Sequence, residues 1–91
     1  MKLRFYRDPE SGFPHIHNHG VNEQEAEDVM RRPGEDRPGR DGVRVALGQT
    51  RQGRYLRVIY VPEEDADVFV ITAYDLHGKP LRAYRKRMRQ R

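Results

Sequence analysis

The chain has 91 residues, of which 35% are hydrophobic and 35% charged, and this predicts a single domain (residues 1–91) with one small core. It has no cysteine, which excludes disulfides and thiolate catalysis, and no apolar run approaches the roughly twenty residues of a membrane-spanning helix. The formal charge is +4 and no apolar signal segment precedes the first charges, so we expect a cytoplasmic protein without a membrane partner.

The N-terminal segment predicts a strand, a turn and a short helix. Leu3 and Phe5 alternate with charged and polar side chains, which indicates a strand over residues 2–7. The sequence DPESG at 8–12 is typical of a turn. A short helix over residues 13–19 is indicated by two residues that favour helix ends, Pro14 at its start and Gly20 after its last turn.

The next helix has the clearest start signal in the sequence. Asn22 can cap the helix, and Glu25 lies three positions later, as a capping box requires. The apolar stripe of this helix consists of Ala26, Val29 and Met30. Pro33 ends the helix, and residues 33–42 predict a polar loop that is longer than most.

Three strands are expected after this loop. Residues 43–47 alternate in polarity, which predicts a strand with one buried face, and residues 55–61 are rich in β-formers. Gly53 suits the hairpin turn between them. Residues 68–74 are the most apolar run, so we expect them to form the central strand, covered on both faces. The short connections favour an antiparallel meander.

A basic helix is expected to end the chain. Pro80 suits its start. Leu81, Tyr84 and Met88 recur at helical spacing, so one stripe of the helix can dock on the body. We expect residues 86–91 to be frayed and solvated. The predicted fold is therefore α+β, with the order β-α-α-β-β-β-α and with helices packed on an antiparallel sheet.

The positive charge is concentrated at the C-terminal end. Residues 79–91 contain seven of the eighteen basic residues and no acidic residue. Residues 1–78 contain the other eleven together with all fourteen acidic residues, which gives them a net charge of −3. A slightly acidic body with a cationic end favours a polyanionic partner, and RNA is the first candidate.

Five motifs extend over nearly the whole chain. They are HIxxHGV at 15–21, EAEDVM at 25–30, RVALGQTRQGRYLRVIYV at 44–61, VITAY at 70–74 and KPLRAYRKR at 79–87. Their order and spacing resemble the BrnT-like toxins, which belong to the RelE/ParE superfamily of type II toxin–antitoxin systems. The resemblance implies a compact RelE-like fold, a ribonuclease activity that needs no ribosome, and a cognate antitoxin protein as partner.

Two histidines are candidates for acid/base chemistry. Metal-independent RNA cleavage uses the 2′-hydroxyl as nucleophile, and it needs proton-transfer groups and cations that stabilise the phosphorane. His19 is the leading candidate because it occupies the matching position of the resembled family. His15, one turn earlier on the same face, is the second. The alternative for His19 is structural, because a histidine in the last helical turn is favoured by the helix dipole.

The same histidines admit a metal-binding alternative. His15 and His19 have the i, i+4 spacing of a helical metal pair, and His17 lies between them. No HExxH arrangement follows, and no third ligand is evident in the sequence. We therefore expect no functional metal and no other cofactor.

Cationic residues supply the remaining site candidates. Arg57 interrupts an apolar strand, so it lies either on a solvated face or at an active surface, and it is the third catalytic candidate. Arg44 alternates outward one strand earlier, and the two arginines share a surface if the hairpin register permits it. The other candidates for binding RNA phosphates lie in the last helix: Lys79, Arg82, Tyr84 and Arg85. For Tyr84, anchoring in the core competes with base stacking.

Three functions remain open from the sequence. The first is an endoribonuclease toxin, which the motif order and the cationic end favour. The second is a noncatalytic toxin-like module that binds nucleic acid or a protein. The third is a gyrase-directed toxin of the ParE type, which shares the broader fold.

Overall fold

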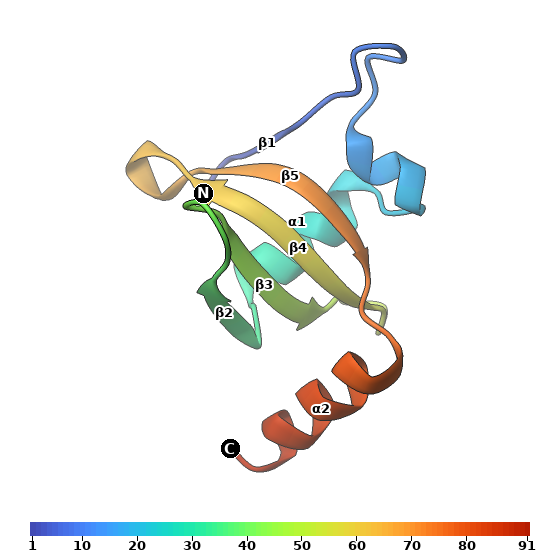
Figure 1. The fold of residues 1–91 in the computed structure, drawn as a ribbon, viewed down its shortest axis with the longest axis vertical. Coiled ribbons are helices and arrows are strands. Elements are labelled where there is room, and N and C mark those ends of the chain that lie inside the picture. Colours follow the sequence, from blue (N-terminus) through green and yellow to red (C-terminus); the bar gives the residue numbers. More distant parts are fainter.

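The computed structural model describes all residues, 1–91, and shows a five-stranded sheet with helices on both faces (Figure 1). In chain order the elements are β1 (Leu3–Phe5), η1 (His15–His19), α1 (Glu23–Arg31), β2 (Glu35–Pro38), β3 (Arg44–Gln49), β4 (Tyr55–Pro62), η2 (Glu64–Ala66), β5 (Val68–Asp75) and α2 (Gly78–Arg89). The α+β class is therefore confirmed. No helix is both long enough and apolar enough to cross a membrane.

The sheet is mixed, with the strand order β1-β5-β4-β3-β2. The predicted meander is confirmed for β3, β4 and β5, which pair antiparallel in sequence order. The prediction of an antiparallel sheet is wrong at β1, which pairs in parallel with β5. The prediction that residues 68–74 form the central strand is also wrong, because β4 is central. No short turn connects β1 to β5, so local sequence carries no signal for this pairing.

Residues 33–42, predicted to be a loop, contain the edge strand β2. Its sequence EDRP lacks an apolar face, and polar contacts hold it against β3 and β4. Asp36 accepts hydrogen bonds from Nε of Arg44 at 3.0 Å and from the hydroxyl of Tyr60 at 2.5 Å. An edge strand also tolerates Pro38. The strand was missed because EDRP contains no β-forming residue and no apolar alternation, although only residues 39–43 separate it from β3.

The two elements before β2 begin and end close to the predicted residues. η1 is a 3-10 helix, not an α-helix, and Gly20 follows it in the left-handed conformation with φ 70°. The capping box of α1 is confirmed: Glu25 N donates to Asn22 Oδ1 at 2.8 Å, and Asn22 N donates to Glu25 Oε1 at 3.0 Å. The predicted apolar stripe of α1 is buried as expected: Ala26, Val29 and Met30.

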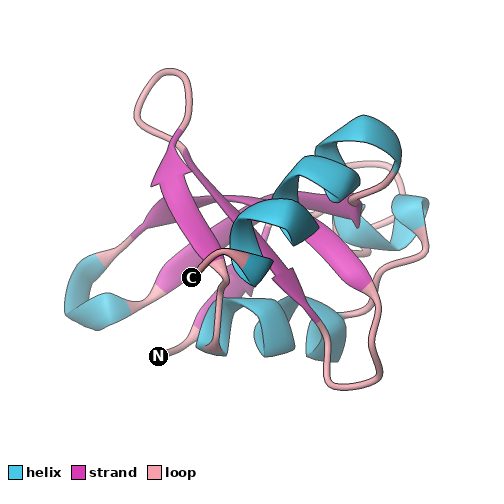
Figure 2. Ribbon diagram, turned by 90° about the horizontal axis from the view of Figure 1, so that it is seen from below, coloured by secondary structure: helices cyan, strands magenta, loops and turns pink.

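The sheet separates two cores of unequal size. The larger core lies between α1, η1 and one sheet face, and Val58 and Val70 are fully buried in it. The smaller core lies on the opposite face under α2 and consists of Leu47, Leu76 and Tyr84. Figure 2 shows α1 and α2 on opposite sides of the sheet. Because α2 covers only one end of its face, the rest of that face is open.

The C-terminal helix continues to Arg89, and Arg87 and Arg91 contact the body, which differs from the frayed and solvated end expected for residues 86–91. Arg87 binds Glu35 through two hydrogen bonds, Nε to Oε2 at 2.5 Å and Nη2 to Oε1 at 2.9 Å. Arg91 Nη1 donates to the carbonyl of Gly34 at 3.0 Å. Both contacts tie α2 to β2 and the residue before it. The basic end was misread because its acidic partner lies in the strand that the sequence did not reveal.

Candidate active site on the open sheet face

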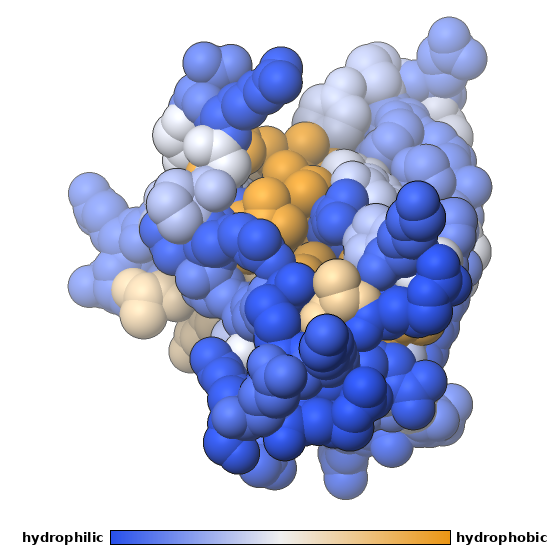
Figure 3. Space-filling model, turned by 60° about the horizontal axis from the view of Figure 1, so that its bottom comes forward, coloured by the Kyte–Doolittle hydropathy of each residue, from blue (hydrophilic) through white to orange (hydrophobic).

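The face of the sheet opposite α1 carries a partly apolar depression. Along β4, Leu56 and Val58 point into the larger core, so Arg57 and Ile59 point to the opposite face. A pocket of about 420 Å³ opens there, lined by Arg37, Gly39, Arg40, Val43, Val45, Leu47, Arg57, Ile59 and Tyr74. Figure 3 shows an apolar patch on this side of the molecule, bordered by hydrophilic side chains.

Arg57 and Tyr74 lie side by side on this face. They are direct cross-strand partners in β4 and β5, and Cζ of Arg57 lies 5.9 Å from the ring centroid of Tyr74. None of the ion pairs of the structure includes Arg57. Both residues also line a second pocket of about 250 Å³ that extends to Lys79. Arg57 is therefore a free cation stacked on an aromatic ring between two pockets.

A row of aromatic rings connects η1 to this face. The ring centroids are 6.1 Å apart for Tyr6 and His15, 5.3 Å for His15 and His19, and 5.8 Å for His19 and Tyr74. β1 pairs with β5 only as far as Val70, and η1 packs beside β5. Of the three predicted catalytic residues, His19 and Arg57 both contact Tyr74, and His15 joins them through its contact with His19. An aromatic residue at the end of an apolar strand gives no sequence signal for this role.

The histidines of η1 differ in their partners. Nδ1 of His15 lies 2.8 Å from Oδ1 of Asp8, and Nδ2 of Asn18 donates to Oδ2 of Asp8 at 2.6 Å. The hydrogen bond from His15 holds the pKa of Asp8 below its usual range. His17 binds Glu23 at 2.7 Å and does not join the ring row. His19 is exposed and its ring makes no hydrogen bond.

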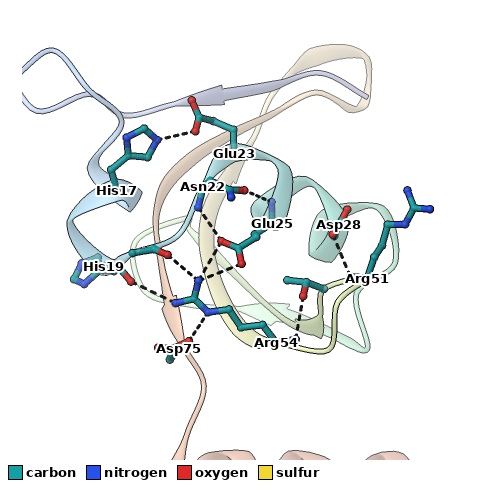
Figure 4. A network of polar contacts seen from close by, with 11 residues as sticks. His17, His19, Asn22, Glu23, Glu25, Asp28, Arg51, Arg54 and Asp75 are labelled. Atoms are coloured by element: carbon teal, nitrogen blue, oxygen red, sulfur yellow. Dashed lines mark hydrogen bonds and ion pairs between the residues drawn. The ribbon is translucent and has the colours of Figure 1, made fainter.

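Arg54 fixes the end of η1 to the body, as Figure 4 shows. Its Nε donates to Oδ1 of Asp75 at 2.8 Å, and its Nη1 donates to the carbonyl of Gly20 at 2.8 Å and to Glu25 at 3.1 Å. Its Nη2 lies 3.5 Å from the carbonyl oxygen of His19. The hydrogen bond with Arg54 lowers the pKa of Asp75. Arg54 thereby holds His19 beside β5, a role that the sequence did not indicate.

Arg44 does not belong to this site. The register pairs Arg44 with Tyr60 and Leu47 with Arg57, so the two arginines point to opposite faces of the sheet. The predicted surface shared by Arg44 and Arg57 is therefore wrong. The guanidinium of Arg44 is bound by Asp36, and this hydrogen bond raises the pKa of Arg44. Arg44 has a structural role in attaching β2.

The four candidates in α2 divide into one anchor and three exposed cations. Tyr84 is only 4% exposed and belongs to the smaller core, so base stacking by its ring is excluded in this structure. Lys79 shares a pocket with Arg57. Arg85 lies 5.6 Å above the ring of Tyr55, beside a pocket of about 300 Å³. Arg82 is exposed and joins no ion pair.

No group of three or more His, Cys, Asp or Glu side chains is arranged to hold a metal ion. His15 and His19 contact each other edge to edge, but Asp8 already occupies Nδ1 of His15. The side chains at the site offer the imidazoles of His15 and His19, a carboxylate, a tyrosine and unpaired cations, and a third imidazole, that of His77, lines the pocket of Arg57 and Lys79.

The fold and the site define an α+β protein with a cationic and partly apolar sheet face, flanked by the two histidines that begin and end a 3-10 helix. Comparison of the chain with protein-family models, curated proteins and solved structures finds no match.

Proposed function

We propose that the chain is a cytoplasmic toxin of a type II toxin–antitoxin system, with a RelE-like fold and BrnT-like character, and that it is a metal-independent endoribonuclease. The observation that carries the proposal is the meeting of His19 and Arg57 on the ring of Tyr74, at an open sheet face. It combines proton-transfer groups with an unpaired guanidinium, which is the chemistry that RNA cleavage requires.

In the proposed reaction, the 2′-hydroxyl of a nucleotide attacks the adjacent phosphorus atom. One histidine accepts the proton of the 2′-hydroxyl, and the other donates a proton to the departing 5′-oxygen. Arg57 and Lys79 stabilise the charge that develops on the nonbridging oxygens, and the planar guanidinium suits two of these oxygens at once. The products are a 2′,3′-cyclic phosphate and a free 5′-hydroxyl.

The surroundings of Arg57 suit single-stranded RNA. The apolar lining and the Tyr74 ring offer stacking surfaces for unpaired bases. Exposed cations on α2 lie beyond the pocket of Arg57 and Lys79 and can follow the phosphate backbone: Arg82, Arg85, Lys86 and Arg89. The cognate antitoxin is the second proposed partner, and an acidic segment of it would compete with RNA for these cations.

The test is cleavage of an end-labelled single-stranded RNA by purified protein in the presence of EDTA. Wild-type protein should release 2′,3′-cyclic phosphate ends. His19→Ala should lower the rate by about 10²-fold or more, and Arg57→Ala by about as much. Two controls match these changes: His17→Ala removes a histidine of η1 outside the ring row, and Arg51→Ala removes a cation from the turn beside α1. Both controls should retain wild-type rates.

The competing functions give different results in the same preparation. Absence of cleavage, both with EDTA and with added divalent metal, would refute the endoribonuclease. Salt-dependent RNA or DNA binding without cleavage would identify the noncatalytic module. Inhibition of gyrase supercoiling with intact RNA would identify the ParE-type alternative.

A further inference from the structure

Asp8 and His15 form the only carboxylate–imidazole pair that borders the ring row. Their hydrogen bond measures 2.8 Å, and His15 stands between Tyr6 and His19 in the row. The second carboxylate–imidazole pair of η1, His17 with Glu23, lies outside the row, and its ring stacks on the exposed Phe13. The first pair is therefore the one that is linked to Tyr74, through the contact of His15 with His19.

The hydrogen bond to Asp8 fixes the tautomer of His15. An ionised carboxylate only accepts hydrogen bonds, so Nδ1 of His15 must be the donor. In the neutral ring this leaves Nε2 unprotonated and free to accept a proton. The hydrogen bond from His15 also keeps the pKa of Asp8 below its usual range, so Asp8 is ionised wherever imidazoles titrate. Asn18 holds the second oxygen of Asp8 at 2.6 Å and stops the carboxylate from rotating.

His19 lacks such an orienting group. Its ring meets His15 edge-on at 5.3 Å and Tyr74 at 5.8 Å, and no side chain hydrogen-bonds to it. It is the member of the pair next to Tyr74, and Arg57 lies over that same ring. The two imidazoles thus differ in environment, which is how two like groups acquire different roles in acid/base catalysis.

We propose that His15 is the general base, that Asp8 is the residue that positions it, and that His19 is the general acid. This assignment rests on the proposed endoribonuclease function. Nε2 of His15 takes the proton of the 2′-hydroxyl while the bond from O2′ to phosphorus forms. The bond from phosphorus to O5′ breaks, and protonated His19 gives its proton to O5′. One proton is taken and one is given, so no further reactant is needed.

The test compares Asp8→Asn with a control from the same loop. Asp8→Asn keeps the size of the side chain but replaces a carboxylate, which can only accept a hydrogen bond, with an amide, which can accept or donate one. Glu10→Gln makes the same charge change at an exposed residue without a hydrogen bond. Asp8→Asn should lower kcat by about 10²-fold with little change in KM, because the base is misoriented while binding is intact. Glu10→Gln should leave kcat unchanged, and Asn18→Ala should lower it by less than Asp8→Asn does.

Imidazole nitrogen shifts measured by NMR supply a readout that does not depend on activity. Neutral His15 should be the Nδ1–H tautomer in the wild type and in Glu10→Gln, and a mixture of tautomers in Asp8→Asn. A wild type that does not cleave RNA refutes the proposed function and this assignment with it. A cleaving wild type with wild-type kcat in Asp8→Asn refutes the assignment alone. If Asp8→Asn unfolds, an unchanged kcat in Asn18→Ala refutes it as well.

Discussion

Replacing Tyr84 with alanine removes the side chain that anchors α2 to the sheet. Tyr84 is 4% exposed, packs with Leu47 and Leu76, and meets the ring of Tyr55 edge-on at 6.2 Å. Its hydroxyl approaches Gly34 so closely that a Cβ atom there would lie 1.9 Å from the hydroxyl oxygen. No other side chain of α2 is fully buried, so the docking of the helix depends on this one ring.

The size of the effect follows from the burial of the ring. Deleting a buried aromatic side chain costs about 3–5 kcal/mol, and more where the space left behind stays empty. A pocket of about 300 Å³ adjoins Tyr84, so water can enter the space, and we expect the lower end, about 3 kcal/mol. A domain of this size has a total stability of about 5–14 kcal/mol. The expected fall in Tm is then about 12–24 °C.

Thermal unfolding followed by circular dichroism measures this loss, with Arg82→Ala as the control on the same helix. The exposed Arg82 makes no ion pair, so its removal should change the stability by less than about 0.5 kcal/mol. Tyr84→Phe keeps the ring and should behave much more like the wild type than Tyr84→Ala does. A Tyr84→Ala Tm within a few degrees of the Arg82→Ala value would show that the ring does not anchor α2.

Two further predictions concern polar contacts. Arg54→Met should destabilise the chain by about 2–3 kcal/mol, because it removes the ion-pair partner of Glu25 and Asp75 and the donor to the carbonyl of Gly20, and it should broaden the NMR signals of His19. Unchanged urea unfolding would contradict this. Glu35→Gln should destabilise the chain at pH 7 but have little effect at about pH 2. The hydrogen bond from Arg87 lowers the pKa of Glu35 below its ordinary 4.5. The ionised Glu35 therefore contributes its full stabilisation above pH 4.5, and this stabilisation is lost as the pH falls through the lowered pKa. An equal Tm difference between Glu35→Gln and the wild type at both pH values would contradict this.

The parts of the fold that follow local rules could be predicted from the sequence. The capping box at Asn22 and Glu25 fixes the start of α1 within three residues, and Gly20 fixes the end of η1. The hairpin between β3 and β4 needs only two β-rich runs and a short turn. Each of these signals acts between residues close together in the chain, where the pattern of side chains determines the backbone.

The parts that failed depend on how strands pair, which the pattern within one strand does not indicate. β2 pairs with β3 across residues 39–43, and Asp36 binds Arg44 and Tyr60, but EDRP has no β-forming pattern that indicates those partners. Likewise, the faces of Arg44 and Arg57 depend on the register of a hairpin, and a shift of one residue would have placed both on one surface. Periodicity identifies strands but does not fix their register.

The candidate site likewise divides into residues that the sequence identifies and residues that only the folded chain reveals. The residue types that carry acid/base and phosphate chemistry, His15, His19 and Arg57, were identified by their chemistry and by resemblance. The residues that position them were not, because Tyr74, Asp8 and Arg54 act through contacts that only the folded chain creates. The sequence predicts that Asp8 is part of a turn, and in the structure Asp8 both begins that turn and binds His15.

The ion pairs also change what the net charge means for binding. Six arginines are held by carboxylates in the fold: Arg4, Arg31, Arg37, Arg44, Arg54 and Arg87. Arg87 shows that part of the basic end stabilises the fold. The cations left for a polyanion are the unpaired ones, and those beside the open face begin at Arg57 and Lys79 and continue along α2. Each phosphate that they contact should add about 0.7 to the slope of binding against salt, so Arg57→Ala should reduce that slope whereas Arg44→Ala should not.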